Sequence, residues 1–269
     1  MTPMMKLTTF ALFIIGFTVN LNCSAVGTIA HAESFDKPVR QVVVNLGRSP
    51  YLKRNNPSRI QLFCLYYPAF MVKELNNPGL KGTRWVTVTP IFNDDAPKCQ
   101  LAHAPTERFL AKEWWSFEGV KGSLLFLEAA DGDGNGGNPF RVLDVKTGKK
   151  VFEDSVYFYR ASHIEFVRTA GKEIKLKYLR VVGGDCSIPK DGLSCWSQFR
   201  KHYGVVFEAV PACMGYLKAG DKEGAMAPDG TVRAPAESTS VVAYPVLVTL
   251  LPHPMITPVS GPVKCGPKP

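Results

Sequence analysis

Residues 140–153, FRVLDVKTGKKVFE, decide the fold class of this chain. Two short runs of β-prone residues, 140–145 and 149–153, flank the tripeptide KTG. Glycine adopts a positive φ at little cost, so Gly148 suits the tight connection between two antiparallel strands. The stretch therefore predicts a β-hairpin.

Similar short runs, rich in β-branched and aromatic residues and separated by Gly, Pro, Asn and Asp, recur along the chain. In residues 173–182, Ile174, Leu176 and Tyr178 alternate with two lysines, as in a strand with one buried face. Residues 241–251 contain Pro245, which favours an edge or bent strand. The other strands that we expect are 59–67, 84–92, 123–130, 155–159 and 163–168.

Helical patterns are confined to two short segments. Residues 106–117, TERFLAKEWWSF, begin with a residue suited to an N-cap and place Phe109 and Trp114 at helical spacing, and residues 194–202 show a similar pattern. Residues 219–240 are rich in Gly, Ala and Pro and predict a long loop. Residues 252–269 contain six prolines and predict an extended tail.

Strands joined by tight turns imply an antiparallel arrangement, because parallel pairs need crossovers of a dozen or more residues. Residues 142–152 resemble the strand, Asp-x-x-Thr-Gly-Lys, strand hairpin that is common in β-propeller blades. Propellers need repeats of about 40 to 50 residues, and the one echo of this motif, at 169–172, lies at hairpin spacing. We expect a mainly β domain, an antiparallel meander of hairpins packed either as a sandwich or as a small propeller, with one or two short helices.

The first 32 residues have the pattern of a cleaved secretory signal. One cation, Lys6, precedes an apolar run at 7–19, and Ala30 and Ala32 supply small residues at the spacing that a signal peptidase reads. The run is too short to span a bilayer, which takes about 20 apolar residues, and no later segment is long enough either. We expect cleavage after Ala32, an extracytoplasmic location, and one domain over 33–251 followed by the tail.

Six cysteines remain after such cleavage. An even number in an exported chain predicts three disulfides, of which 15 pairings are possible. Cys186 and Cys195 enclose a short loop of turn residues and form the most plausible local pair, while Cys265 would fasten the Pro-rich tail. No CxxC pair or zinc-like spacing is present. The six cysteines are Cys64, Cys99, Cys186, Cys195, Cys213 and Cys265.

The chain is basic, with a net charge of +9 that falls to +8 when Lys6 is removed with the signal. A basic surface attracts anionic partners such as acidic polysaccharide, phosphorylated lipid headgroups or nucleic acid. Acidic polysaccharide or an envelope protein is the partner that we expect. The cations are interleaved with carboxylates, as on an ordinary solvated surface, and no nucleic-acid-binding motif accompanies them.

Residues 131–138, DGDGNGGN, contain a fragment of a calcium-binding loop. Asp131, Asp133 and Asn135 place oxygen ligands at alternate positions, and Gly136 follows at the sixth position, where a sharp turn is needed. The twelfth position is Val142 instead of the usual bidentate Glu. The fragment predicts weak calcium binding, and the alternative is a Gly-rich connection that binds nothing.

Motifs for catalysis are absent: the sequence contains no GxSxG, HExxH or GxxxxGK[ST] pattern. The histidines of the mature chain are isolated in sequence. Trp114 and Trp115 are adjacent and cannot both point inward, so one of them is a candidate for an exposed stacking surface. The alternative is that one tryptophan fills the core and the other covers a loop. The histidines are His103, His163, His202 and His253.

Three functions fit these features. A noncatalytic exported binding module is favoured by the lack of enzyme motifs and the long loops. An exported hydrolase would need an acid and a base that meet only in the fold. A structural envelope protein would show an apolar patch or an unpaired edge strand. The carboxylates considered for a hydrolase are Asp94, Asp95, Asp131 and Glu165.

Overall fold

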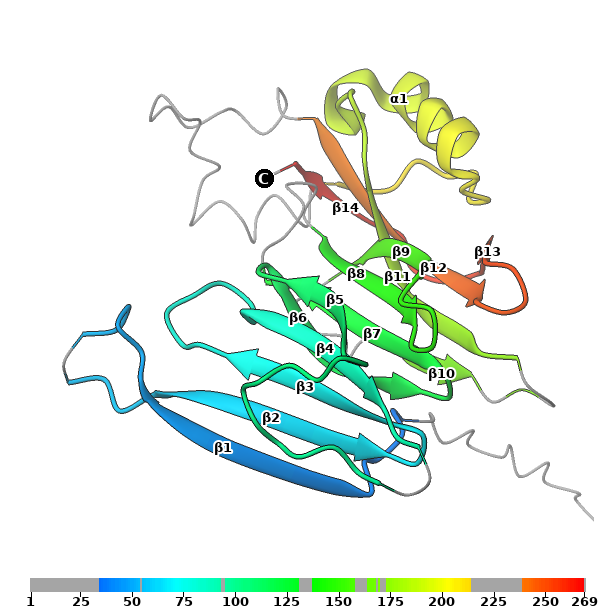
Figure 1. Ribbon diagram of the computed structural model, residues 1–269. Helices are drawn as coiled ribbons and strands as arrows, with labels where there is room; N and C mark the ends of the chain where they lie inside the picture. The colour runs from blue at the N-terminus through cyan, green and yellow to red at the C-terminus, as the bar shows by residue number, and fades with distance from the viewer. Residues whose placement is uncertain are drawn as a thin grey trace, which may run out of the picture. The chain divides into compact units, whose positions relative to one another are not determined.

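The structure is a computed structural model that describes residues 34–53, 55–92, 95–130, 137–157, 164–167, 169, 173–213 and 239–268. In these residues, antiparallel strands form two sheets, and one helix accompanies them (Figure 1). The mainly β, antiparallel fold that the sequence predicts is confirmed.

The first sheet contains five strands in the order β1-β2-β3-β4-β5, so each strand pairs with its neighbour in sequence. Its side chains alternate between two faces. Val72 and Val86 lie on the face that meets the second sheet, whereas Met71 and Trp85 belong to a separate cluster on the outer face. The strands are β1 (Arg40–Arg48), β2 (Arg59–Tyr67), β3 (Phe70–Asn76), β4 (Trp85–Pro90) and β5 (Arg108–Lys112).

The second sheet contains nine strands. Its main path runs β13-β12-β11-β9-β8-β7-β6, while β10 pairs with β11 and β14 pairs with β12. The strands are β6 (Trp115–Lys121), β7 (Leu124–Ala129), β8 (Asn138–Asp144), β9 (Lys150–Val156), β10 (Glu165–Val167), β11 (Lys175–Gly183), β12 (Ser240–Thr249), β13 (Met255–Pro258) and β14 (Lys264–Pro267).

The hairpin between β8 and β9 forms at the position that the sequence predicts. The Asp144 carboxylate accepts hydrogen bonds from the Thr147 N–H at 2.7 Å and from the Thr147 hydroxyl at 2.8 Å. Gly148 has a φ of 70° and donates its N–H to the Asp144 carbonyl at 2.7 Å. The turn therefore depends on both the Asp side chain and the glycine.

The two sheets pack face to face. Leu125 and Leu127 of β7 lie in one buried cluster with Val72 and Val86 of the first sheet. This arrangement is a sandwich, so of the two packings that the sequence leaves open, the propeller-like one is not observed in the described residues.

The other face of the nine-stranded sheet is covered by α1 (Ile188–Tyr203). Trp196 and Phe199 of the helix lie in the same cluster as Val242 and Tyr244 of β12. The helix expected at 194–202 is confirmed. A proline-containing helical turn precedes it, and Gly192, with a φ of 52° and a ψ of −126°, breaks the helix between the two.

A buried polar network joins β9 to β11, whose backbone pairing is a single pair, Val156 opposite Arg180. The Asp154 carboxylate accepts hydrogen bonds from the Tyr178 hydroxyl at 2.5 Å and from Arg180 Nε at 3.0 Å. Arg180 also donates to the Tyr244 hydroxyl of β12 at 3.2 Å. Side chains thus connect these strands where backbone hydrogen bonds are few.

Pro245 lies within β12, which has neighbours on both sides and is not an edge strand. On the side away from β11, β14 pairs with residues 240–243 and β13 with residues 246–249. Pro245 therefore falls between two partner strands, where its missing N–H breaks no ladder. The expected tail, 252–269, supplies these two strands.

The helix expected at 106–117 is wrong, because these residues contain β5 and the start of β6. The apolar residues that match helical spacing there belong to strands of two different sheets. Of the strand expected at 155–159, Ser155 and Val156 form the end of β9, and residues 158 and 159 lie outside the described residues.

The six cysteines of the predicted mature chain are paired in three disulfides: Cys64–Cys99, Cys186–Cys195 and Cys213–Cys265. The local pair that the sequence favours, between Cys186 and Cys195, is present. Cys265 lies on β14, so its bond to Cys213 joins the C-terminal strands to the segment that follows α1. Over the described ranges, no helix is long and apolar enough to cross a membrane.

Candidate functional site

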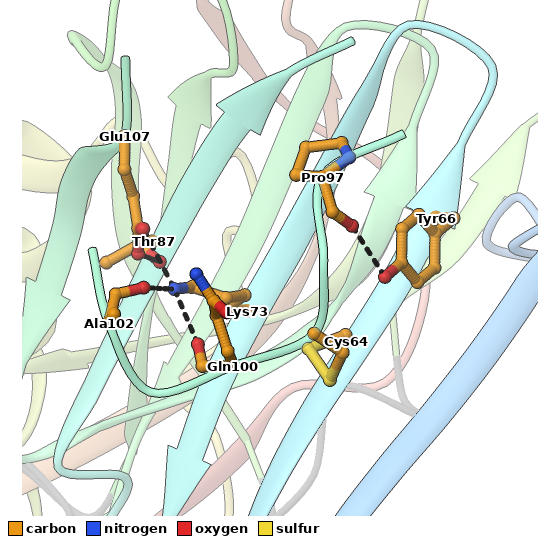
Figure 2. The surroundings of a disulfide bond; sticks show 9 residues. Cys64, Tyr66, Lys73, Thr87, Pro97, Gln100, Ala102 and Glu107 are labelled. Atoms are coloured by element: carbon orange, nitrogen blue, oxygen red, sulfur yellow. Dashed lines mark hydrogen bonds and ion pairs between the residues drawn. A yellow bond between two sulfur atoms is a disulfide. The ribbon is translucent and has the colours of Figure 1, made fainter. Parts of the chain in front are cut away.

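A buried ion pair lies on the outer face of the five-stranded sheet, near the Cys64–Cys99 disulfide (Figure 2). Lys73 Nζ is 2.8 Å from Glu107 Oε2, and the two side chains are 2% and 1% exposed. Lys73 also donates to the carbonyls of Gln100 at 3.1 Å and Ala102 at 3.0 Å. An ammonium group has three protons, so these three acceptors satisfy Lys73 completely.

Glu107 has several further donors around it. Its carboxylate accepts hydrogen bonds from the Thr87 hydroxyl and from the Ala104 N–H, and it lies 2.9 Å from His103 Nδ1. Burial acts to raise the pKa of Glu107, but the hydrogen bonds outweigh burial and hold this pKa below its usual value. A carboxylate held in its charged form by a lysine is a poor proton acceptor. The cluster therefore serves to fix the segment 95–107 over the sheet.

His103 lies at the surface side of this cluster, with its side chain 40% exposed. Its ring is 4.7 Å from the ring of Phe109 and 5.1 Å from that of Trp85, measured between centroids. A histidine oriented by a carboxylate is one part of a nucleophilic site. The hydroxyl bonded to the same carboxylate, Thr87, is fully buried and cannot reach a substrate.

Of the carboxylates considered for a hydrolase, the two that the structure describes lie in different parts of the fold. Asp95 lies between β4 and β5 and forms an isolated bridge with Phe92, whereas Glu165 lies on β10 of the other sheet. Asp94 and Asp131 lie outside the described residues, as does His163. Of the other histidines, His202 packs against Tyr203 and His253 is exposed.

Several surface pockets lie among the described residues. One of them, of about 530 Å³, contains two carboxylates, Asp36 and Glu173. Each lies near a lysine: Asp36 is 3.5 Å from Lys121 and Glu173 is 3.0 Å from Lys175. A second pocket of about 460 Å³ lies beside α1, and a third of about 370 Å³ is lined by Glu165 and two lysines. The pairing with lysine argues against an acid and base pair in the first of these pockets.

The predicted calcium ligands Asp131, Asp133 and Asn135 lie outside the described residues. The described ends of that loop carry buried polar groups. The Asn138 amide donates to the Glu128 carboxylate, and Asn138 Oδ1 is buried with no hydrogen-bond partner among the described atoms. In the described part of the chain, no cluster of three or more His, Cys, Asp or Glu side chains could hold a metal ion.

Trp114 stands in the short connection between β5 and β6 and has a φ of 72°, a left-handed conformation that is unusual for a bulky residue. Its N–H donates to the Lys81 carbonyl at 3.4 Å, and its carbonyl accepts from the Ala130 N–H at 2.7 Å. A side chain at Gly82 would come within 2.9 Å of the Trp114 backbone. Contacts from two segments, Lys81–Gly82 and Ala130, thus hold this backbone in place.

The Trp114 side chain is 55% exposed. Lys81 Nζ lies 5.7 Å from its ring centroid, within the range of a cation–π contact. The next residue, Trp115, is partly buried against the core between the sheets, and Arg141 lies 4.2 Å from its ring. The sequence expectation that one of the two tryptophans is exposed agrees with this arrangement.

Sequence reasoning missed the Lys73–Glu107 pair. Lys73 and Glu74 interrupt the apolar pattern of β3, so this strand was not expected, and nothing local shows that Lys73 is buried. The sequence also gives no sign of the φ of Trp114, because Gly82 and Ala130, which hold it, are distant in the chain.

Comparison with known proteins assigns this chain to no family. Searches against protein families, curated proteins and solved structures find no match. The function must therefore be inferred from the site itself.

Proposed function

We propose that this protein is an exported, noncatalytic binding module whose contact surface is centred on Trp114. The observation that supports it is the combination of an exposed indole ring and a left-handed backbone in one residue. A strained residue of this kind costs about 1 to 3 kcal/mol and persists only when its surroundings impose it. Rigid, exposed aromatic side chains are typical anchors in binding surfaces.

Export is supported by the signal-like pattern of residues 1–32 and by the three disulfides, which persist in oxidising compartments. N-terminal sequencing of the protein from its native host tests this part. We expect the mature chain to begin at Glu33. A mature chain that begins upstream of residue 25 would contradict the cleavage site.

Binding is tested by pull-down on insoluble neutral and acidic polysaccharides and on washed cell envelopes. We compare the wild type with Trp114→Gly, which removes the ring and suits the positive φ, and with Met255→Ala, which removes another exposed apolar side chain. At least one matrix should retain the wild type and Met255→Ala but not Trp114→Gly. Equal retention of all three proteins on every matrix would refute a binding surface at Trp114.

A hydrolase remains the second candidate, and the contact of 2.9 Å between His103 and Glu107 favours it. Screening with esterase, glycosidase, peptidase and phosphatase substrates is the test, with His103→Ala as the variant and His202→Ala as the control. Turnover that is lost only in His103→Ala would establish catalysis. The binding proposal expects no turnover above that of a heat-denatured sample.

A structural envelope role receives less support. β1 ends the five-stranded sheet and exposes Val43, so it offers an unpaired edge. The strand also has Arg40 and Arg48 at its ends and an irregularity between Asn45 and Gly47. Charges and bulges of this kind are the features by which proteins prevent pairing at an edge.

A further inference from the structure

We propose that residues 34–36, Ser-Phe-Asp, form a detachable strap, and that the seat beneath the strap also binds a separate peptide with an aromatic residue followed by a carboxylate. The seat lies at the end of β6 that is opposite to Trp114, so this inference is independent of the Trp114 surface. The seat consists of Gly119, Val120, Lys121 and Gly122, together with Phe126 of β7 and Phe166 of β10.

The seat contains a socket for one aromatic ring, which Phe35 fills. The centroid of the Phe35 ring lies 5.3 Å from that of Phe126 and 5.0 Å from that of Phe166, both in edge-to-face geometry. A Cβ atom at Gly119 would come within 2.4 Å of the Phe35 ring, so a side chain at this position would displace the ring. Phe126 and Phe166 belong to the buried core of the nine-stranded sheet, which fixes the walls of the socket.

The seat also contains a clamp for one carboxylate, that of Asp36. The Gly122 N–H donates to Asp36 Oδ2 at 2.6 Å, and Lys121 Nζ lies 3.5 Å from Asp36 Oδ1. The backbone is held as well, because the Asp36 N–H donates to the Val120 carbonyl at 2.8 Å and Lys121 donates to the Ser34 carbonyl at 3.1 Å.

These contacts are those of an extended peptide on the edge of a sheet. In the strand order of the nine-stranded sheet, β6 is the last strand, and the strap lies against its end. Peptides that bind at a sheet edge gain affinity from main-chain hydrogen bonds and specificity from pockets for side chains. The seat supplies both kinds of contact, so it is suited to a peptide that repeats the Phe-Asp pattern of the strap.

The strap is attached in a way that allows it to leave. Ser34 is exposed, Phe35 and Asp36 are only half-buried, and none of the three disulfides involves the strap. Lys37 and Val39, which connect the strap to β1, are exposed as well. Segments near a chain end with few buried contacts open at a low cost in free energy.

Space for a longer peptide is present beside the seat. The pocket of about 530 Å³ is lined by Asp36 of the strap and by Lys121, Gly122 and Phe166 of the seat. A peptide that replaces the strap can therefore extend into this pocket while it makes the same contacts with the socket and the clamp.

The experiment measures binding of a synthetic peptide of residues 33–39, ESFDKPV, to the mature protein, residues 33–269. Phe35→Ala vacates the socket in the full chain, whereas Phe92→Ala removes an exposed ring far along the chain and is the control. A strap that is seated in about nine molecules of ten lowers the apparent affinity about tenfold. We therefore expect the peptide to bind Phe35→Ala at least about tenfold more tightly than the wild type or Phe92→Ala.

Two further comparisons test the socket and the clamp. Adding Gly119→Ala to Phe35→Ala should abolish peptide binding, because the new Cβ atom occupies the position of the ring. A peptide with alanine in place of phenylalanine should not bind, and one with asparagine in place of aspartate should bind about tenfold more weakly. Phe35→Leu replaces Phe35→Ala if the latter does not fold.

The outcomes separate this inference from the proposed function. Absence of peptide binding to Phe35→Ala and Phe35→Leu would show that the strap is a fixed part of the fold and would overturn the inference. Equal binding of the alanine-containing peptide, or binding that persists with Gly119→Ala, would overturn it as well, because the socket would not be the site. Trp114→Gly should leave the affinity of Phe35→Ala for the peptide unchanged, so failure here leaves the Trp114 surface standing.

Discussion

At the residue scale, the backbone of Trp114 can be tested separately from its ring. Trp114→Gly and Trp114→Ala both remove the indole, but only glycine adopts a φ near 72° without strain. We expect Trp114→Gly to be more stable than Trp114→Ala by about 1 kcal/mol. Urea denaturation of the two variants measures this difference, and equal free energies of unfolding would show that the connection relaxes around a new side chain.

Glu74 is a buried carboxyl whose pKa is shifted toward neutral pH. It lies on the inner face of β3, where its carboxylate accepts a hydrogen bond from the Phe117 N–H at 3.2 Å. Burial raises the pKa of Glu74 from 4.5 to about 7, and the hydrogen bond from Phe117 opposes this only in part. Between about pH 4.5 and pH 7, the Glu74 carboxyl therefore keeps its proton in the folded protein but has released it in the unfolded chain.

The pH dependence follows from that difference. Because the folded pKa is the higher one, the stabilising effect of this proton is complete below about pH 4.5 and is lost as the pH rises through 7. At about 1.4 kcal/mol for each pKa unit, the loss reaches about 3 kcal/mol. We expect Glu74→Gln to be more stable than the wild type above pH 7, with a smaller pH dependence, in denaturation measured from pH 5 to 8.5. The exposed Glu165→Gln is the control, and identical profiles for Glu74→Gln and wild type would contradict the prediction.

The two tryptophans show what sequence can predict about one residue. That one of the pair must be exposed follows from their adjacency, in a helix or in a strand. Which one is exposed, and in what backbone conformation, depends on contacts with Gly82 and Ala130. The same contacts explain why the expected helix over 106–117 is absent, since they turn the chain from one sheet to the other at Trp114.

At the scale of elements, the Lys73–Glu107 pair attaches the segment 95–107 to the five-stranded sheet. Lys73→Met keeps the size of the side chain but leaves the Glu107 carboxylate buried without its cation. Loss of one partner from a buried pair costs about 3 to 5 kcal/mol. We expect a loss of that size in chemical denaturation, and partial recovery in the double variant with Glu107→Gln. Lys150→Met, which breaks an exposed pair with Glu153, should cost less than about 1 kcal/mol.

Calcium binding by the connection between β7 and β8 stays a prediction, because its three proposed ligands lie outside the described residues. Asp131, Asp133 and Asn135 offer two carboxylates and one amide, a set that predicts binding at the millimolar level. We expect calcium to raise the melting temperature of the wild type relative to a sample with chelator, and to have no effect on Asp133→Ala. Equal melting temperatures in all four samples would show that the loop binds no calcium.

Sequence patterns locate most strands of the second sheet but miss β1, β3, β5, β6, β13 and β14. The strands that were found have regular alternation or a turn signal such as that at Gly148. In β3, Lys73 and Glu74 look like solvent-exposed positions. Lys73 is nevertheless fully buried, where it pairs with Glu107, and Glu74 lies between the sheets. A charged residue becomes a core residue only through a partner far along the chain, which local periodicity does not contain.

At the scale of the whole molecule, the number of disulfides could be predicted and most of their pairing could not. An even count in an exported chain implies three bonds, and proximity in sequence identifies Cys186–Cys195. The pairs Cys64–Cys99 and Cys213–Cys265 join segments that meet only in the folded sheets. The Trp114 surface has the same origin, because it forms where the connection between the two sheets meets the turn that contains Lys81 and Gly82.

The disulfides should contribute unequally to stability. In the chain-entropy account, a bond that closes a longer loop restricts the unfolded chain more. Cys213–Cys265 closes a separation of 52 residues and Cys186–Cys195 one of 9, which corresponds to about 4 and about 3 kcal/mol respectively. We expect the double variant Cys213→Ala with Cys265→Ala to lose more stability in urea than Cys186→Ala with Cys195→Ala. Since both bonds border the core cluster beneath α1, the effect of the missing sulfur atoms is similar in the two variants, and a reversed order would show that native packing, not loop length, governs the contribution of these bonds.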